Sequence, residues 1–74
     1  MDLIDEVEKR LKKEFKTADL EIDFSDGQHM TIKIISADFE GMNLLDQHRK
    51  VYSAVQDLID EGHLHAVKLI TKSK

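Results

Sequence analysis

The chain has 74 residues with no cysteine and no proline, and 11 Lys and Arg against 15 Asp and Glu give it a formal net charge of −4 at pH 7. A chain this short has room for one core, so we predict a single domain over residues 1–74. The lack of cysteine excludes disulfides, thiolate nucleophiles and cysteine-rich zinc fingers. The negative net charge disfavours a nucleic-acid-binding protein that relies on neutralising backbone phosphates.

The sequence carries no sign of membrane insertion or export. No apolar run approaches the roughly 20 residues of a membrane-spanning helix. The start of the chain, Met1 to Asp5, lacks the basic region and apolar stretch of a signal peptide. We therefore expect a cytoplasmic protein, or the mature part of an organellar one.

The first predicted element is an amphipathic helix near the start of the chain. Its apolar residues fall on one helical face: Leu3, Ile4, Val7, Leu11 and Phe15. The first turn is acidic and the later turns are basic, which complements the helix dipole. The basic residues are Lys9, Arg10, Lys12, Lys13 and Lys16. They could bind nucleic acid, but their alternation with Glu8 and Glu14 favours an ordinary solvated face.

Two strands that form a hairpin come next. Apolar residues occupy alternate positions in each: Leu20, Ile22 and Phe24 in the first strand, and Met30, Ile32 and Ile34 in the second. The Asp-Gly step within Ser25–Gln28 is a turn signal, so the strands are predicted to pair antiparallel. His29 lies where this turn enters the second strand.

A tight turn at Phe39–Gly41 leads into the longest helix, predicted from Leu44 to Glu61. Asn43 is the expected N-cap, and Gly62 is the expected C′ residue. The face predicted to be buried consists of Leu45, His48, Tyr52, Val55 and Ile59, widened by Val51 and Leu58.

A third strand is predicted from Leu64 to Thr71. Val67 and Leu69 should face the core, with His65 in the same phase at the leading end of the strand. A strand-helix-strand crossover is usually right-handed and joins parallel strands. We therefore predict an α/β (α+β) fold of order αββαβ, with a three-stranded mixed sheet and both helices on one face.

Three motifs at this order and spacing carry a family resemblance. They are the Phe-x-Gly turn within Ser36–Gly41, the His-Arg-x-Val-Tyr segment within residues 48–55, and the His-Ala step that begins at His65. Together they strongly resemble the BolA-like family, in its compact, short-loop bacterial branch. The resemblance implies a domain similar to the type II KH fold. Because the family's second helix is often described in two parts, a break near Val51 to Ser53 would fit.

The resemblance implies a protein partner rather than a reaction. Proteins of this kind bind monothiol glutaredoxins and share a [2Fe-2S] cluster with the glutaredoxin and its glutathione, in cluster trafficking or iron-dependent regulation. The implied iron ligand is His65, and a second ligand from the loop between the first two strands would be His29. Imidazole in place of thiolate raises the reduction potential of such a cluster.

Each candidate residue also has a simpler interpretation. From spacing alone, His65 would be a buried histidine bonded to a backbone carbonyl, and the family resemblance reverses that preference. His48 fits a packed, hydrogen-bonded role on the buried face of its helix. Gly41 fits a turn that needs a positive φ. The residues we nonetheless assign to partner binding are Gly41, His48, Arg49, Lys50 and His63, with Arg49 and Lys50 pointing away from the core.

The alternative function is that of a KH-like nucleic-acid-binding transcriptional regulator. Against it, the Gly-x-x-Gly loop of KH domains is missing, because Gly41 has Leu44 three residues on. Catalysis is not expected, since no base, nucleophile or oxyanion arrangement accompanies the acidic residues Asp57, Asp60 and Glu61. An interaction module for an unrelated protein stays open, and we expect the free chain to be monomeric.

Overall fold

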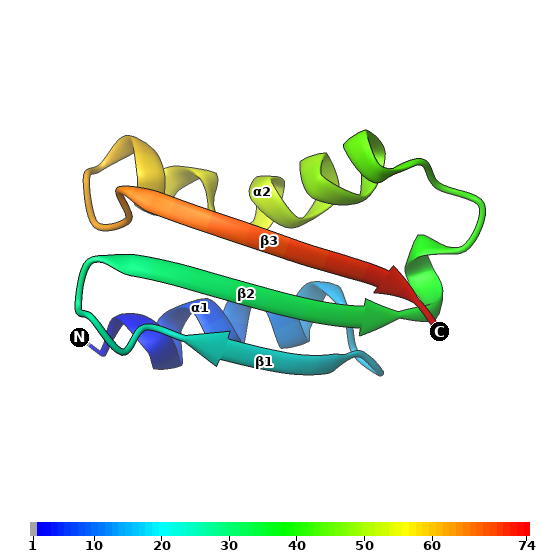
Figure 1. Cartoon of the computed structure of the whole chain (residues 1–74), viewed down its shortest axis with the longest axis horizontal. Coiled ribbons are helices and arrows are strands. Elements are labelled where there is room, and N and C mark those ends of the chain that lie inside the picture. The colour runs from blue at the N-terminus through cyan, green and yellow to red at the C-terminus, as the bar shows by residue number, and fades with distance from the viewer. Residues whose placement is uncertain (1) are drawn as a thin grey trace.

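The computed structural model describes residues 2–74, with the exception of the Ala66 side chain. Its elements run in the order α1 (Leu3–Glu14), β1 (Asp19–Asp23), β2 (His29–Ser36), the short 3-10 turn η1 (Ala37–Phe39), α2 (Leu44–Asp60) and β3 (Ala66–Ser73) (Figure 1). This order is the αββαβ arrangement predicted from the sequence.

The three strands form one sheet in the order β1-β2-β3. β1 and β2 pair antiparallel, whereas β2 and β3 pair parallel because α2 carries the chain back to the end of the sheet at which β2 begins. The two helices lie on the same face of this sheet (Figure 1), and no helix of residues 2–74 covers the opposite face. The predicted mixed sheet is therefore confirmed.

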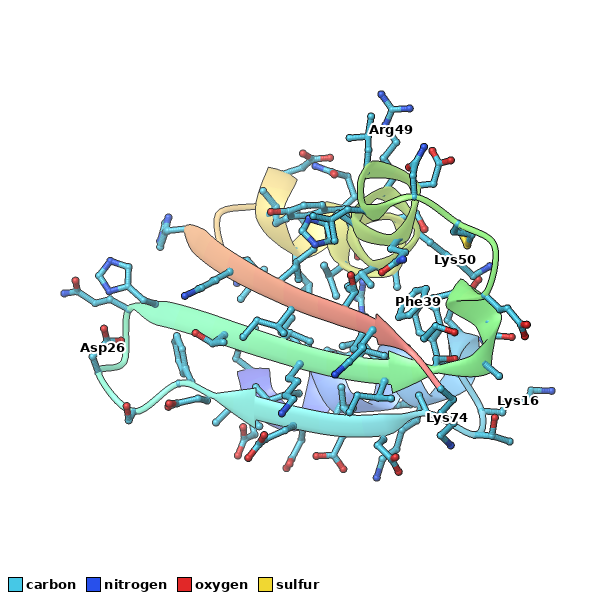
Figure 2. All side chains as sticks on the ribbon, turned by 45° about the vertical axis from the view of Figure 1, so that its right-hand side comes forward. Lys16, Asp26, Phe39, Arg49, Lys50 and Lys74 are labelled. Atoms are coloured by element: carbon cyan, nitrogen blue, oxygen red, sulfur yellow. The ribbon has the colours of Figure 1, made fainter. Side chains whose placement is uncertain are left out.

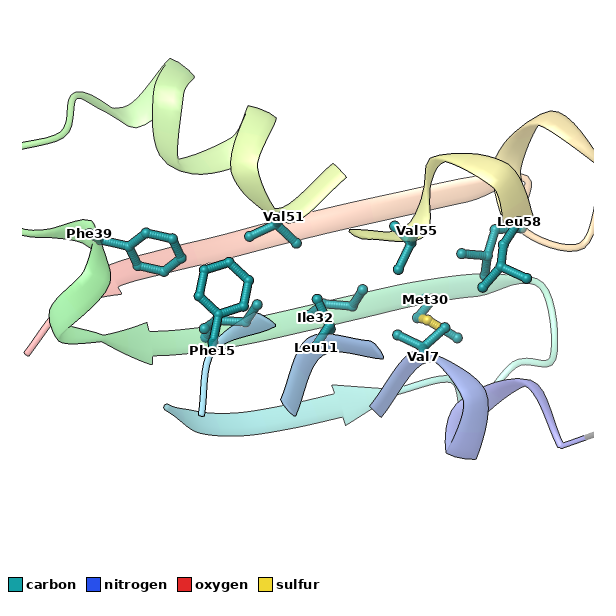
Figure 3. Close-up of a cluster of buried hydrophobic side chains, with 11 residues drawn as sticks. Val7, Leu11, Phe15, Met30, Ile32, Phe39, Val51, Val55 and Leu58 are labelled. Atoms are coloured by element: carbon teal, nitrogen blue, oxygen red, sulfur yellow. The ribbon is translucent and has the colours of Figure 1, made fainter. Parts of the chain in front are cut away.

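The core lies between the sheet and the two helices (Figure 3). Its buried apolar residues are Val7, Leu11, Phe15, Met30, Ile32, Ile34, Phe39, Val51, Val55, Leu58 and Leu64. The rings of Phe15 and Phe39 meet with their centroids 5.2 Å apart and their planes tilted by 53°. This contact fixes η1 against the end of α1 and makes Phe39 the apolar anchor of the Phe-x-Gly turn.

α1 is tied to α2 through Arg10. The Arg10 Nε donates to Oε2 of Glu6 at 2.9 Å, and its Nη1 donates to Oδ1 of Asp57. The guanidinium beside Asp57 lowers the pKa of that carboxyl below its ordinary value. Lys12 pairs with Glu8 at 2.9 Å along the same helix. Part of the basic face of α1 is thus occupied by ion pairs, as its alternating charges suggested.

The ends of α2 are those predicted from its capping residues. Oδ1 of Asn43 accepts a hydrogen bond from the backbone N–H of Asp46 at 2.8 Å, and Gly62 adopts φ +84° just beyond the helix. Between these ends the helix is continuous, so the break expected near Val51 to Ser53 does not occur. Val51 is fully buried, and the Ser53 hydroxyl donates to the Lys50 carbonyl at 2.7 Å without interrupting the helix.

The buried face of α2 is narrower than predicted. Leu45, expected in the core, is 57% exposed, and Leu44 beside it is 60% exposed. Lys50, expected to point away, is half-buried and places Nζ 5.9 Å from the centroid of the Phe15 ring. Even with these leucines at its start, α2 does not have the length and apolar content needed to cross a membrane, and neither does any other helix within residues 2–74.

Candidate functional site

The turn between β1 and β2 is organised by the carboxylate of Asp26. Its Oδ1 accepts hydrogen bonds from the backbone N–H groups of His29 and Gln28, at 2.7 and 2.8 Å. Its Oδ2 is 2.7 Å from Nδ1 of the His29 ring. These contacts lower the pKa of Asp26 to about 2, and the backbone N–H of His29 contributes most. Gly27 supplies the positive φ, +73°, that closes the turn.

The segment that follows α2 is fixed by a Schellman motif. The N–H of Gly62 donates to the carbonyl of Ile59 at 3.1 Å, and the N–H of His63 donates to the carbonyl of Leu58 at 2.9 Å. Leu64 then enters the core, with only 3% of its surface exposed. The backbone that carries His63 and His65 is therefore anchored by these hydrogen bonds and by the burial of Leu64.

His63 and His65 lie on either side of this buried leucine, and both are exposed. The expectation that His65 shares the core-facing phase of β3 is wrong, because β3 begins at Ala66, two residues after the predicted start, and Leu64 is the residue that fills the core. The simpler interpretation of His65 as a buried, carbonyl-bonded histidine is excluded for the same reason. Its ring is accessible to another molecule.

The parallel register brings the two predicted metal ligands to one end of the sheet. His29 is the register partner of Ala66, the residue that follows His65. Neighbouring strands lie about 4.8 Å apart, so the starts of β2 and β3 are adjacent. Figure 1 shows both strands beginning at the same end, beside the β1–β2 turn. An open hollow at this end is lined by His29, Met30, Thr31, Val67 and Lys68.

Among the other predicted contact residues, His63 lies next to this end, two residues before His65. The remaining ones belong to the turn before α2 or to the first half of α2 and lie elsewhere. Gly41 adopts φ +79° in the turn before α2, as expected of its architectural role. Arg49 is exposed in the first half of α2, and Figure 2 shows Arg49 and Lys50 well away from Asp26, which marks the β1–β2 turn. A partner that covers the two histidines would reach Arg49 only by extending along α2.

His48 departs from its prediction in another way. It is half-buried in α2 as expected, but its Nε2 is shielded from solvent and has no hydrogen-bond partner within the described part of the chain. The packed role is therefore confirmed and the hydrogen-bonded one is not. Because that nitrogen is enclosed, His48 is less available for contact with a partner protein than its place in the helix motif suggested.

Comparison with known proteins decides the family. A family model described as BolA-like protein matches residues 6–74. The chain belongs to the BolA-like family. The fold agrees, because the structure of BolA1 from Arabidopsis thaliana superposes with a TM-score of 0.88 at 30% identity, over 99% of this chain and 93% of that one.

Two further relatives show how much of the chain is similar to known proteins. An uncharacterised protein of Rickettsia prowazekii is 32% identical over 71 residues, which is 93% of this chain and 91% of that protein. Its NMR structure, described as BolA-like, gives a TM-score of 0.74. The chloroplast protein BOLA1 of Arabidopsis thaliana is 44% identical over 48 residues, which cover 65% of this chain and only 29% of that protein.

Within this BolA-like chain, Asp26 is the site residue that the sequence analysis missed. The Asp-Gly step was read only as a turn signal. The available signal was the spacing, because a carboxylate three residues before a histidine, in a turn that folds back on itself, is placed to reach both the backbone and the ring of that histidine. Both contacts are present at 2.7 Å.

Proposed function

We propose that this BolA-like chain is a non-enzymatic, cytoplasmic partner of a monothiol glutaredoxin. In this proposal the two proteins share a [2Fe-2S] cluster, in cluster trafficking or iron-dependent regulation, with His65 and His29 as the ligands from this chain. The observation that carries the proposal is the placement of two exposed imidazoles at one end of the sheet by the register of His29 with Ala66.

The donor set fits a shared cluster better than a metal bound by this chain alone. Among the described residues, no group of three or more His, Asp or Glu side chains gathers into a metal site. The chain has no cysteine, so in this proposal the thiolates come from the glutaredoxin and its glutathione. When bound, the cluster supplies iron or one-electron chemistry, and imidazole ligation sets a higher potential than thiolate does.

The acidic residues of α2 support a role without catalysis. Asp57 is held by the guanidinium of Arg10, and Oδ1 of Asp60 accepts a hydrogen bond from Nε2 of Gln56 at 2.9 Å. Each has a structural partner on a helix surface, and within residues 2–74 neither one is hydrogen-bonded to a nucleophilic side chain. Their contacts stabilise helices rather than activate a substrate.

The proposal is tested by mixing the apo chain with cluster-loaded glutaredoxin and recording the visible absorption and circular dichroism. The wild-type chain should change both spectra, because an imidazole replaces a ligand of the cluster. His65→Ala should abolish most of that change. His63→Ala is the comparison variant, since His63 is an exposed histidine on the same short segment and lies further from the start of β3. Because His63 is itself assigned to partner binding, its spectra are recorded at concentrations that saturate the complex, where it should keep the wild-type change.

Two results would count against the proposal. If the wild-type chain leaves the cluster spectrum unaltered at concentrations where the two proteins bind, the cluster is not shared. If His65→Ala and wild type give the same spectrum, His65 is not a ligand, even if the two proteins still associate. Isothermal titration calorimetry of each variant separates loss of ligation from loss of binding.

A further inference from the structure

The carboxylate of Asp26 makes two kinds of contact, one with each oxygen. Oδ1 accepts from the backbone N–H groups of Gln28 and His29, which is the ordinary way for an aspartate to stabilise a turn. Oδ2 takes no part in those bonds, and its hydrogen-bond partner among the described residues is Nδ1 of the His29 ring, at 2.7 Å. The ring contact is therefore separable from the turn.

This contact fixes the tautomer of the imidazole. An ionised carboxylate accepts hydrogen bonds and donates none, so Nδ1 of His29 must carry the proton. In the neutral ring the other nitrogen, Nε2, then holds a lone pair. Because the His29 side chain is 66% exposed, that lone pair is accessible to a metal from outside the molecule.

The same pairing is found around metal-bound histidines. A ligating imidazole usually donates its second ring N–H to a carboxylate or a carbonyl, which fixes the ring and makes the ligating nitrogen more basic. At His29 this supporting contact is already formed in the chain by itself. No such contact accompanies His63 among the described residues, which distinguishes His29 from another exposed histidine of the same chain.

We infer that Asp26 is a positioning residue that holds His29 in the Nδ1–H tautomer and so presents Nε2 to a metal ion. The inference rests on the proposed function for the identity of that metal, the iron of the shared cluster. Asp26 itself does not touch the metal. Its role is to select the nitrogen that binds and to remove the need for a proton shift within the ring when the metal arrives.

Asp26→Asn separates this role from the turn. The Asn side-chain oxygen can still accept from the backbone N–H groups of Gln28 and His29, so the turn is retained. Its amide NH₂ replaces Oδ2 and can only donate, so the His29 ring must turn an unprotonated Nδ1 toward it or lose the contact. Asp23→Asn is the matched control, because Oδ1 of Asp23 accepts from the N–H of Ser25 at 3.0 Å in the same hairpin.

The first measurement uses the chain alone. Long-range ¹H–¹⁵N correlation spectra of the histidine rings should show a protonated Nδ1 and an unprotonated Nε2 at His29 in the wild type. Asp26→Asn should shift the proton to Nε2, and Asp23→Asn should leave the wild-type pattern. An Nε2–H tautomer of His29 in the wild type, or an Asp26→Asn spectrum identical to it, would overturn the inference.

The second measurement is a titration of the same three chains with Ni²⁺, followed through the ring signals of His29. Loss of an outer carboxylate typically weakens metal affinity 10- to 100-fold, so Asp26→Asn should bind Ni²⁺ at His29 at least about 10-fold more weakly than the wild type. Equal affinities would overturn the inference even if the tautomer changed. Neither readout involves glutaredoxin, so a failure of the proposed function appears only in the cluster spectra and leaves these results standing.

Discussion

Gln47 holds the start of α2 against the far end of β3. Its Nε2 donates to the carbonyl of Met42 at 2.9 Å, and its Oε1 accepts from the hydroxyl of Thr71 at 2.7 Å. One partly buried amide therefore satisfies a carbonyl in the turn before the helix and a hydroxyl on the edge strand. The Gln47 side chain is long enough to reach both groups, and its amide can donate to one and accept from the other.

Replacing this amide should cost stability. We expect Gln47→Ala to lower the free energy of unfolding by about 1–2 kcal/mol, because it leaves partly buried groups of Met42 and Thr71 without partners. Gln56→Ala is the control on the same helix, since Gln56 bonds Asp60 on an exposed surface and such pairs contribute roughly 0.2–0.5 kcal/mol. Urea unfolding measures both, and equal losses would contradict the assignment.

At the same scale, the surroundings of the three histidines were only partly predictable from the sequence. The exposure of His65 depends on whether Leu64 or His65 fills the core, and alternation alone favoured the histidine. The partner of His29 depends on how the turn folds, which places Asp26 at 2.7 Å from the ring. The enclosed Nε2 of His48 depends on packing contributed by other elements. The environments of His65 and His48 therefore depend on residues from other parts of the fold, whereas the contact of His29 with Asp26 is local and was signalled by their three-residue spacing.

At the scale of elements, the local signals were sufficient. The alternation in β1 and β2, the Asp-Gly turn, the Asn43 cap and the glycine after α2 are all short-range patterns, and each corresponds to an observed feature. The failures concern α2, because the break expected near Val51 to Ser53 does not occur and the first turn is more exposed than predicted. Leu45 lies roughly 100° around the helix from the line of Val51, Val55 and Leu58, so it continues the apolar pattern without facing the sheet.

The topology already implied that the predicted contact residues would separate. α2 runs back along the sheet for 17 residues, or about 25 Å at 1.5 Å per residue. Its beginning therefore lies far from the start of β3, and Arg49 lies far from His65. The prediction placed Arg49 and His65 at one contact surface because both belong to the family motifs, and it did not take this distance into account.

The ion pair between α1 and α2 should make stability depend on pH. Arg10 lowers the folded-state pKa of Asp57 below its ordinary value of 3.8, so the pair contributes fully above about pH 4 and its contribution is lost as pH falls through the lower folded pKa. The difference in unfolding free energy between wild type and Asp57→Asn should therefore be larger at pH 7 than near pH 3.

Urea unfolding of both chains at the two pH values tests this expectation. Asp60→Asn serves as the control, because Asp60 bonds the neutral side chain of Gln56. A wild-type advantage over Asp57→Asn that is the same at pH 7 and pH 3 would show that the pair does not depend on the charge of Asp57. Added salt should reduce the advantage at pH 7, since Asp57 is 55% exposed.

At the scale of the whole molecule, the charge distribution argues against nucleic acid as the main partner. The net charge is −4, Arg10 and Lys12 are engaged in ion pairs, and Lys50 leans over the Phe15 ring. We expect binding to a fluorescein-labelled DNA duplex to be no tighter than about 10⁻⁴ M at physiological salt. Fluorescence anisotropy at 50 and 200 mM salt measures this, and a micromolar affinity that falls steeply with salt would favour the KH-like alternative.

The register between β2 and β3 limits how the spacing of His29 and His65 can be altered by mutation. A slip of β3 by one residue would turn Val67 and Leu69 away from the interior, which the apolar core does not tolerate. The packing of Val67 and Leu69 against the core therefore sets the spacing between the imidazoles of His29 and His65. The spacing can be changed most easily through the turn at residues 25–28, because the other connection, residues 61–65, contains the buried core residue Leu64.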